Sequence, residues 1–318
     1  MRAPKPETKP LVRPRDYGAP GSGYRPSMSD VLILGASGYL GAELSRQART
    51  LGLAVTGSWF DRPLARVGGA QLDLRDRTAV RVLVERLRPA LIINAAFRQH
   101  EWAITADGPA NAALAAADVG ARFVQVSSDA VFAGRPTPYP EDSHPEPTTP
   151  YGAAKAAAET AVRAILPTAV IARTSLIMGP DSSHERRVLD QLAGNASVVL
   201  FTDDIRCPAH VADLAAALLE LGTGELGGIF HLGGPDALTR YEAGRLMATA
   251  NGQDADRLRP GRRADVGLTS PSVIMLDGSN TRTRLRTRLR GATEFLTLPA
   301  DRVSSPEVRN HQPGLDPP

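Results

Sequence analysis

The chain has 318 residues, of which 42% are hydrophobic, which is enough for one large α/β domain or for a domain with a smaller lobe. The formal net charge is only +3, and the first 29 residues hold six basic against two acidic side chains, so the remainder is nearly neutral and a nucleic-acid partner is not expected. No apolar run approaches the roughly 20 residues of a membrane helix. A single cysteine, Cys207, excludes an internal disulfide. We expect a cytoplasmic protein that does not bind membranes.

The two ends of the chain differ in composition from its middle. Residues 1–28 hold six prolines and little apolar periodicity, which is typical of a disordered extension. Met28 lies directly before Ser29-Asp30-Val31, where the first apolar strand begins, so we expect residues 1–27 to lie upstream of the true start. Residues 303–318, with four prolines, predict a second disordered tail.

Between these ends, short apolar runs rich in β-branched residues alternate with stretches of helical periodicity. This alternation is typical of an α/β fold with a doubly wound parallel sheet, the Rossmann fold, and we expect a dinucleotide-binding domain over residues 29–175. The predicted strands are 31–34, 54–58, 91–94, 122–127 and 169–173, and the predicted helices are 39–51, 78–88, 109–119 and 151–165.

After residue 175 the periodicity weakens, and we expect a smaller lobe over residues 176–302 that mainly binds substrate. In 282–290, arginines alternate with Leu285 and Leu289, which predicts an amphipathic helix with its arginines in water. The proline-rich stretch 135–150 predicts a loop over the site. The other expected elements here are helices 185–193, 210–221 and 241–251 and strands 198–201 and 228–232.

A glycine-rich segment joins the first strand to the first helix. Its glycines allow a tight turn and let the backbone approach a pyrophosphate, which then lies at the positive end of the helix. The small side chains of Ala95 and Ala96, at the end of another strand, leave room for such a ligand. The segment predicts a dinucleotide site that includes Gly35, Ser37, Gly38, Tyr39, Leu40 and Gly41.

Tyr151 and Lys155 lie four residues apart on a predicted helix, so their side chains share one face. The Lys155 ammonium is expected to lower the pKa of the Tyr151 phenol, while Ser128, at a strand end, orients a reacting carbonyl. The three residues predict acid/base chemistry on a carbonyl or alcohol.

Seven blocks in order resemble the extended short-chain dehydrogenases of the dTDP-4-dehydrorhamnose reductase type, also called sugar-nucleotide-binding reductases, over roughly residues 29–296. They are Gly35-x-x-Gly38-x-x-Gly41, Leu72-Asp73-Leu74, Asn94-Ala95-Ala96, Ser127-Ser128-Asp129-Ala130-Val131-Phe132, Pro138-Tyr139-Pro140-Glu141-Asp142, Pro150-Tyr151-Gly152-x-x-Lys155-x-x-x-Glu159 and Arg173-Thr174-Ser175. Ala130 and Leu176 stand where the family often has larger side chains, so the sugar pocket is expected to differ.

The resemblance implies roles for individual residues. Asp73 and Leu74 are expected to contact the adenine, although Asp73 is also a candidate helix cap. Asn94, Ala95 and Ala96 are expected to line the path of the cofactor. Ser128, Tyr151 and Lys155 are expected to do the chemistry, with Tyr151 and Lys155 also touching the cofactor.

The residues that follow the second strand bear on the choice of cofactor. An acidic residue there selects NAD, whereas a basic one suits the 2′-phosphate of NADP. Ser58 and Arg62 are suited to hold a phosphate, and Asp61 lies beyond the strand end. The sequence therefore favours NADP, with NAD as the alternative.

Four residues are candidates for binding a nucleotide-sugar substrate. Arg98 and Arg206 are suited to pair with a diphosphate, and Trp102 to stack on a sugar or base. Asp129 is suited to support the substrate or the loop geometry. The alternatives are surface ion pairs for the arginines and interface packing for Trp102. Both His210 and His231 are expected to be structural, and no spacing of ligands predicts a metal site.

Three functions remain open at this point. The first is an NAD(P)H-dependent reductase of the C4 keto group of a nucleotide-linked 6-deoxysugar, with Tyr151 as the proton donor. The second is an epimerase or dehydratase that retains NAD, although a dehydratase generally has Glu after Asp129, where this chain has Ala130. The third is a non-catalytic regulatory nucleotide-binding subunit. The resemblance also implies a homodimer, for which the sequence identifies no interface.

Overall fold

The computed structural model describes residues 31–64, 69–194 and 198–297. The two predicted disordered tails, 1–28 and 303–318, lie outside the described residues. Across the three described ranges, no helix is both long and apolar enough to cross a membrane.

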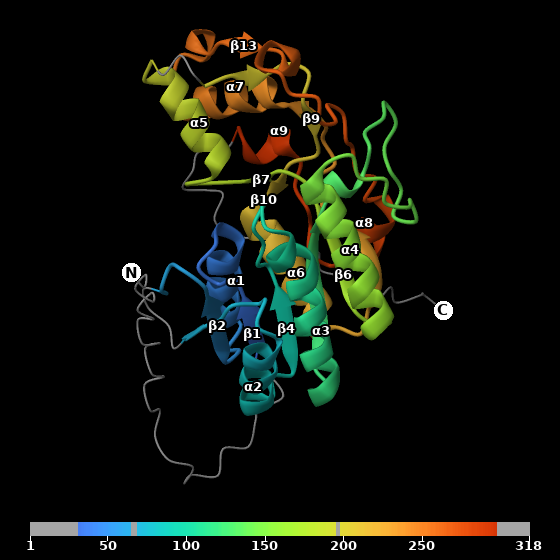
Figure 1. Ribbon diagram of the computed structural model, residues 1–318. Coiled ribbons are helices and arrows are strands. Elements are labelled where there is room, and N and C mark those ends of the chain that lie inside the picture. The colour runs from blue at the N-terminus through green and yellow to red at the C-terminus, as the bar shows by residue number, and fades with distance from the viewer. Residues whose placement is uncertain (1–30, 65–68, 195–197, 298–318) are drawn as a thin grey trace, which may run out of the picture.

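A seven-stranded sheet forms the centre of the molecule, in the order β11-β6-β5-β4-β1-β2-β3 (Figure 1). Every neighbouring pair is parallel, which confirms the doubly wound sheet expected from the sequence. Strands β1, β4 and β6 are buried along their whole length, as expected for strands covered on both faces. The strands are β1 (Val31–Leu34), β2 (Val55–Trp59), β3 (Gly69–Gln71), β4 (Leu91–Asn94), β5 (Arg122–Ser128), β6 (Val170–Thr174) and β11 (Gly228–His231).

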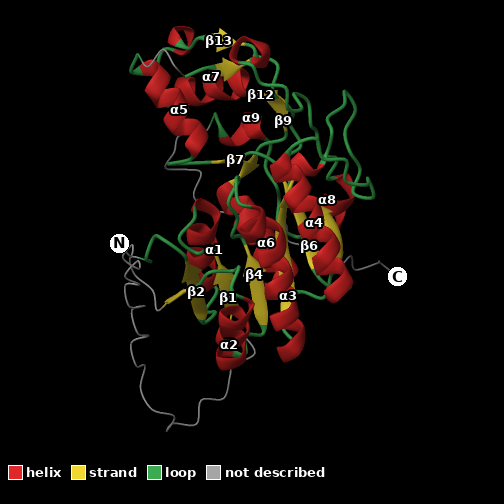
Figure 2. Ribbon diagram, in the orientation of Figure 1, coloured by secondary structure: helices red, strands yellow, loops and turns green. Residues whose placement is uncertain are grey.

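Helices cover both faces of this sheet (Figure 2). On one face, α1 (Tyr39–Thr50) and α6 (Val211–Thr223) pack on a core with β1 and β4. On the other face lie α2 (Arg77–Leu87), α3 (Gly108–Val119) and α4 (Pro150–Ile165). Since β1 is flanked by β2 on one side and β4 on the other, the strand order reverses there, and a crevice opens at the carboxyl ends of the strands.

A smaller lobe with its own apolar core lies at one end of the sheet (Figure 1). Two elements of the stretch expected to form this lobe lie elsewhere: β11 is a strand of the central sheet, and α6 packs on one face of that sheet. A division of the chain at residue 175 therefore stays a prediction. The lobe and its connections contain β7 (Ile177–Met178), α5 (Ser183–Leu192), β8 (Leu200–Phe201), β9 (Ile205–Arg206), β10 (Ala209–His210), β12 (Leu238–Thr239), α7 (Arg240–Ala250), β13 (Pro260–Gly261) and α9 (Ala292–Phe295).

The amphipathic helix predicted over 282–290 is wrong. Helix α8 spans Ser279–Arg284, and its C-cap, Leu285, already has extended backbone. Leu285 and Leu289 are buried as expected, but so is Arg290, whose Nη2 lies 2.7 Å from Oδ1 of Asp213 on α6. The buried carboxylate of Asp213 thus binds Arg290 in the interior of the protein, whereas the helical pattern predicted that this arginine faces water.

Several short elements have no clear signal in the sequence. A π-helical turn at Ala103–Asp107 precedes α3, and 3-10 turns form at Asp129–Val131, Ala255–Arg257 and Arg263–Val266. The proline-rich stretch 135–150 is largely irregular, as predicted. Only its last two residues, Thr149 and Pro150, line the cavity described below, so it does not cover the site as expected.

Candidate active site

A cavity of about 920 Å³ lies between the carboxyl ends of the sheet strands and the smaller lobe. Its wall contains the glycine-rich turn after β1, the ends of β2, β4 and β5, the start of α4, and side chains of the lobe. The fold therefore gathers most of the predicted site residues at one crevice.

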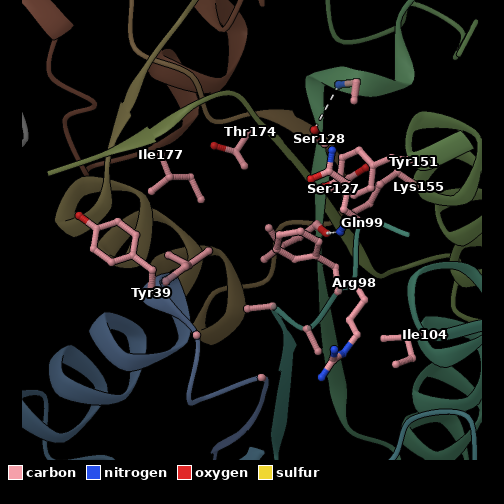
Figure 3. Close-up of a pocket in the computed structure, with 18 of the residues that line it drawn as sticks. Tyr39, Arg98, Gln99, Ile104, Ser127, Ser128, Tyr151, Lys155, Thr174 and Ile177 are labelled. Atoms are coloured by element: carbon pink, nitrogen blue, oxygen red, sulfur yellow. Dashed lines mark hydrogen bonds between the residues drawn. The ribbon is translucent and has the colours of Figure 1, made fainter. Parts of the chain in front are cut away.

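Ser128, Tyr151 and Lys155 gather on one side of this cavity (Figure 3). Ser128 is the last residue of β5, and the other two lie one turn apart at the start of α4. Thr149 caps this helix by accepting a hydrogen bond from the Gly152 N–H at 3.0 Å, and Pro150 begins it.

The Tyr151 phenol does not show the lowered pKa expected from the sequence. Burial raises its pKa, and a hydrogen bond with Ser128 offsets this only in part. The Lys155 Nζ is 5.9 Å from the centre of the Tyr151 ring and donates to the Val126 carbonyl at 3.0 Å. Tyr151 is therefore protonated at neutral pH, the state that a proton donor requires.

Lys155 is the only lysine in the sequence after Lys9. The other basic side chains from residue 10 onward are arginines and histidines. The Lys155 side chain is buried, and this burial lowers its pKa from 10.5 to about 8. The carboxylate of Glu159, one turn further along α4, raises the pKa and keeps it from falling further.

Asp129 connects Ser128 to the lobe. One carboxylate oxygen accepts from the Ser128 hydroxyl at 3.2 Å, and the other accepts from the Ser175 hydroxyl at 2.6 Å. The Nε of Arg206 lies 3.6 Å from Asp129 Oδ2. The Ser128 hydroxyl oxygen also accepts from the Ala130 N–H at 3.2 Å, which fixes its position.

The glycine turn presents bare backbone to the cavity. Gly35 has φ +80°, and its N–H donates to the Ser58 hydroxyl at 3.3 Å. Gly41 packs so tightly that an added Cβ would lie 2.1 Å from the Gly35 carbonyl oxygen. At the N-terminus of α1, Gly38 supplies no side-chain cap, and no acidic residue lies in the first turn. The N–H groups in the first turn of α1, which have no partner within the helix, suit an anionic group.

The neighbourhood of Asp73 and Leu74 forms another part of the wall. The carboxylate of Asp73 is bound by the Arg75 guanidinium at 2.7 Å, which lowers the Asp73 pKa, and Asp76 caps α2 instead. The alternative prediction, that Asp73 caps the helix, is therefore wrong. Asn94 does not line the cavity: it is buried, and its amide donates to Gln125 and accepts from the Ala96 N–H.

Arg98 lies apart from the triad, and its side chain extends away from it (Figure 3). It forms an ion pair with Asp61, just past β2, and its guanidinium lies 5.3 Å from the centre of the Phe60 ring. Arg98 thus lies beside the end of β2, in the segment whose residues are expected to decide between NAD and NADP. This geometry does not fit the expected role of Arg98 on a substrate diphosphate.

The lobe wall centres on Asp204, a buried carboxylate shared by three arginines. Arg206 Nη1 lies 2.6 Å from it, Arg240 Nε 3.0 Å and Arg263 Nη1 3.1 Å. All four residues line the cavity, so this wall carries an excess of positive charge. Sequence reasoning found Arg206 but missed Arg240 and Arg263, because nothing in the local sequence shows that they converge on one acid.

The remaining candidates lie outside the site. Trp102 is 51% exposed and does not line the cavity. His210 caps α6, and the His231 ring contacts the Asp277 carbonyl; burial lowers the pKa of each to about 4. Cys207 is a buried free thiol. Among the described residues, no group of three or more potential ligands forms a metal site.

Sequence reasoning also missed polar and aromatic residues of the wall. Thr174 and Ser175 line the cavity from the end of β6, and Phe97 lies with its ring centre 5.7 Å from that of Tyr151. Ser175 stood within a block of the family resemblance, but its bond to Asp129 could only be seen in three dimensions.

Comparison with known proteins gives consistent matches. The family described as "RmlD substrate binding domain" matches residues 28–298. The dTDP-4-dehydrorhamnose reductase of Mycolicibacterium smegmatis is 33% identical over 264 residues, which cover 76% of each chain. Methionine adenosyltransferase 2 subunit beta of Xenopus laevis is 31% identical over 258 residues, covering 75% of this chain and 77% of the relative.

A solved structure is also similar. The dTDP-4-dehydrorhamnose reductase of Bacillus anthracis, in complex with NADP, superposes with a TM-score of 0.75 at 25% identity, covering 85% of this chain and 97% of that one. The likeness extends over the sheet and the lobe together.

Proposed function

Since this chain belongs to the family of the RmlD substrate binding domain, we propose that it is an NAD(P)H-dependent reductase of a nucleotide-linked keto sugar. Within that class, the substrate we favour is a 4-keto-6-deoxysugar, as in the relatives named dTDP-4-dehydrorhamnose reductase. The observation that carries this proposal is the convergence of Ser128, Tyr151 and Lys155 on a cavity that the glycine turn also lines.

The residues present fit a dinucleotide. The uncapped N-terminus of α1 and the bare backbone at Gly35 and Gly38 suit the pyrophosphate. Leu74 and Ala96 offer apolar wall for the adenosine end, and Ser37, Tyr39, Leu40 and Ala95 complete the lining. Asn94 supports this wall from behind through its bond to the Ala96 N–H.

NADP fits this site better than NAD. A carboxylate near the end of the second strand favours the ribose hydroxyls of NAD, but the Asp61 carboxylate is already paired with the Arg98 guanidinium. Arg62 and Ser58 line the same end of the cavity, and they supply further groups for a 2′-phosphate.

The chain's own residues then divide the chemistry among them. The hydride comes from the reduced nicotinamide ring of the bound cofactor. Tyr151 donates the proton to the developing alkoxide, and the Ser128 hydroxyl, which turns from Asp129 toward the same oxygen, donates a hydrogen bond to it. Lys155 holds the nicotinamide ribose and places a positive charge near the phenolate that Tyr151 becomes. Asp129 accepts the Ser128 hydrogen bond before substrate binds and lines the cavity beside the sugar.

The lobe supplies the groups that bind the rest of the substrate. Arg206, Arg240 and Arg263 together exceed the charge of Asp204, and their guanidinium groups suit the diphosphate of a nucleotide sugar. We therefore assign the diphosphate to this wall.

Replacing Tyr151 with Phe tests the proposal. Turnover of dTDP-linked 4-keto sugars should fall by about 10³-fold, because the proton donor is lost, while the dissociation constant for NADPH stays within about twofold. Tyr139→Phe is the matched control: Tyr139 is buried outside the cavity, stacked on Phe132, and its change should leave turnover intact. Full activity of the Tyr151→Phe protein would refute the mechanism.

A second candidate function has one specific observation in its favour, the 31% identity to methionine adenosyltransferase 2 subunit beta. A regulatory subunit would bind the dinucleotide through the same glycine turn and would reduce no sugar. NADPH binding without turnover on a panel of keto-sugar nucleotides, together with a stable complex with a catalytic partner, would support this alternative.

A further inference from the structure

Directly behind the triad lies a buried pair of opposite charges, Glu159 on α4 and Arg173 on β6. Their side chains are 3% and 1% exposed. Arg173 binds both carboxylate oxygens: Nη2 donates to Oε2 at 2.8 Å, and Nε donates to Oε1 at 3.1 Å and to Oε2 at 3.2 Å. Removing two charges from water is costly, and such a pair is weak evidence for stability by itself. The remaining contacts of each partner show what else the pair does.

Glu159 joins the strand that carries Ser128 to the helix that carries Lys155. Its Oε1 accepts from the Ser127 hydroxyl at 2.5 Å, and Ser127 directly precedes Ser128. Because Glu159 is four residues after Lys155 on α4, the two side chains lie on one face of the helix. The Lys155 ammonium donates to the next carbonyl back along β5, that of Val126, at 3.0 Å.

Arg173 fixes the segment that leads into Tyr151. Its Nη1 donates to the carbonyl oxygens of Glu141 at 3.3 Å and Ser143 at 3.1 Å, in the loop before α4. Arg173 is also the register partner of Ser127 across β5 and β6. The Arg173 guanidinium therefore fixes the loop that precedes Tyr151, and it also binds the Glu159 carboxylate, which accepts from Ser127.

The charges around Lys155 come from several elements. On α4 itself stand Tyr151 and Glu159, with Arg173 of β6 behind Glu159. Asp129 lies at the end of β5, against Ser128. The π-helical turn and α3, which also pack on α4, carry only the exposed acids Asp107 and Asp118. Glu159 is thus the buried carboxylate one turn from a buried ammonium.

We infer that Glu159, held by Arg173, is a positioning residue of the triad: it sets the end of β5 against α4 and supplies the negative charge that keeps Lys155 an ammonium. The inference rests on the proposed function for the role of Lys155 in catalysis. Burial lowers the Lys155 pKa to about 8 even with Glu159 present, so loss of this carboxylate lowers it toward neutrality.

Titration of Lys155 itself provides a test that does not depend on turnover. The chain contains three lysines, Lys5, Lys9 and Lys155, so full-length protein labelled with [ε-13C]lysine gives three side-chain NMR signals. The signal that is missing in Lys155→Met identifies Lys155, and its midpoint in the wild-type protein is expected near pH 8.

Two substitutions should move this midpoint in opposite directions. Glu159→Gln keeps an oxygen for Ser127 but removes the charge, so the midpoint should fall by about one pH unit. Arg173→Met leaves the Glu159 carboxylate without its cation, so the midpoint should rise. The alkaline limb of kcat/KM for keto-sugar reduction should shift with the midpoint in each variant.

Asp213→Asn is the matched control, because Asp213 and Arg290 form a second buried pair, with side chains 1% and 4% exposed, that does not line the cavity. This variant should lose stability as Glu159→Gln does but leave the Lys155 midpoint unchanged. A Glu159→Gln midpoint equal to that of the wild type, or an equal shift in Asp213→Asn, overturns the inference. If Arg173→Met does not fold, the other two variants decide it. Should the chain reduce no keto sugar, the proposed function fails while the titration still decides this inference.

Discussion

The two walls of the cleft hold their polar groups in different ways. On the sheet wall, main chain fixes the reactive side chains: Ser128 accepts from the Ala130 N–H, and Lys155 donates to the Val126 carbonyl. On the lobe wall, an ion cluster holds the polar groups: three arginines share Asp204, and two of them, Arg206 and Arg263, also donate to main-chain carbonyls. The difference indicates that the sheet wall sets the chemical step, for which geometry must be rigid, and the lobe wall sets the binding of a charged substrate.

The largest expected effect comes from replacing Lys155 with Met on the sheet wall. A lysine whose folded-state pKa is about 8, against 10.5 in the unfolded chain, destabilises the protein fully below pH 8, because the buried ammonium is then present. The penalty amounts to about 3 kcal/mol, from about 1.4 kcal/mol per pKa unit. Lys155→Met should therefore raise the free energy of unfolding by up to this amount at pH 7 and abolish turnover.

The sign of this effect can be followed with pH. Between pH 8 and pH 10.5, the folded wild-type protein loses the proton that the unfolded chain keeps, so its stability rises and the advantage of Lys155→Met shrinks. Urea unfolding at several pH values measures this. Arg163→Met, an exposed cation on the same helix, is the control and should show a small difference independent of pH. A stability gain that stays constant up to pH 10.5 would contradict the buried-charge explanation.

A change on the lobe wall should affect binding and leave the chemical step intact. In Arg240→Gln, the KM for the nucleotide sugar should rise by about 10-fold to 100-fold, with kcat and the dissociation constant for NADPH nearly unchanged, because a charged hydrogen bond to the diphosphate is lost. Steady-state kinetics measure the split. Arg245→Gln, on the same helix but paired with Asp256 outside the cavity, is the matched control. A loss of kcat in Arg240→Gln would contradict the assignment of the chemical step to the sheet wall and of substrate binding to the lobe wall.

The same contrast explains what the sequence could predict. The sheet wall was predictable because strand ends and one turn of helix place Ser128, Tyr151 and Lys155 by local geometry. The lobe wall was not predictable, since Asp204 precedes β9, Arg240 begins α7 and Arg263 begins a 3-10 turn, and only the folded chain brings them together. The surface helix predicted over 282–290 was wrong for a related reason. The periodicity correctly predicted burial of the two leucines, but Asp213, which is distant in the sequence, binds Arg290 in the interior.

The raised pKa of Tyr151 could not be predicted from the sequence either. The spacing of Tyr151 and Lys155 predicts that they share a helix face, but it does not show how deeply either side chain is buried. Burial decides the direction of both pKa shifts here. A motif therefore identifies the groups that react, whereas their protonation states depend on the packing of α4 against β5.

The Asp61–Arg98 pair is an ion pair on the sheet side, so charged side chains hold one another there as they do on the lobe wall. By the argument above, it should govern binding of the cofactor and leave the chemical step unaffected. In Arg98→Gln, the dissociation constant for NADPH should rise by about fivefold to tenfold, while that for NADH stays within about twofold, because only NADPH carries the 2′-phosphate. Fluorescence titration of each cofactor measures this.

Arg75→Gln is the matched control for this last prediction. Arg75 lies 5.4 Å from the centre of the same Phe60 ring and binds Asp73, but it does not line the cavity. Its loss should change both affinities alike, because Asp73, which Arg75 binds, lines the part of the cavity expected to hold the adenine common to both cofactors. Asp61→Asn should act in the opposite direction to Arg98→Gln, since it frees the guanidinium for the phosphate and tightens NADPH binding. Equal weakening of NADPH and NADH in Arg98→Gln would show that Arg98 supports the wall of the cleft without reading the phosphate.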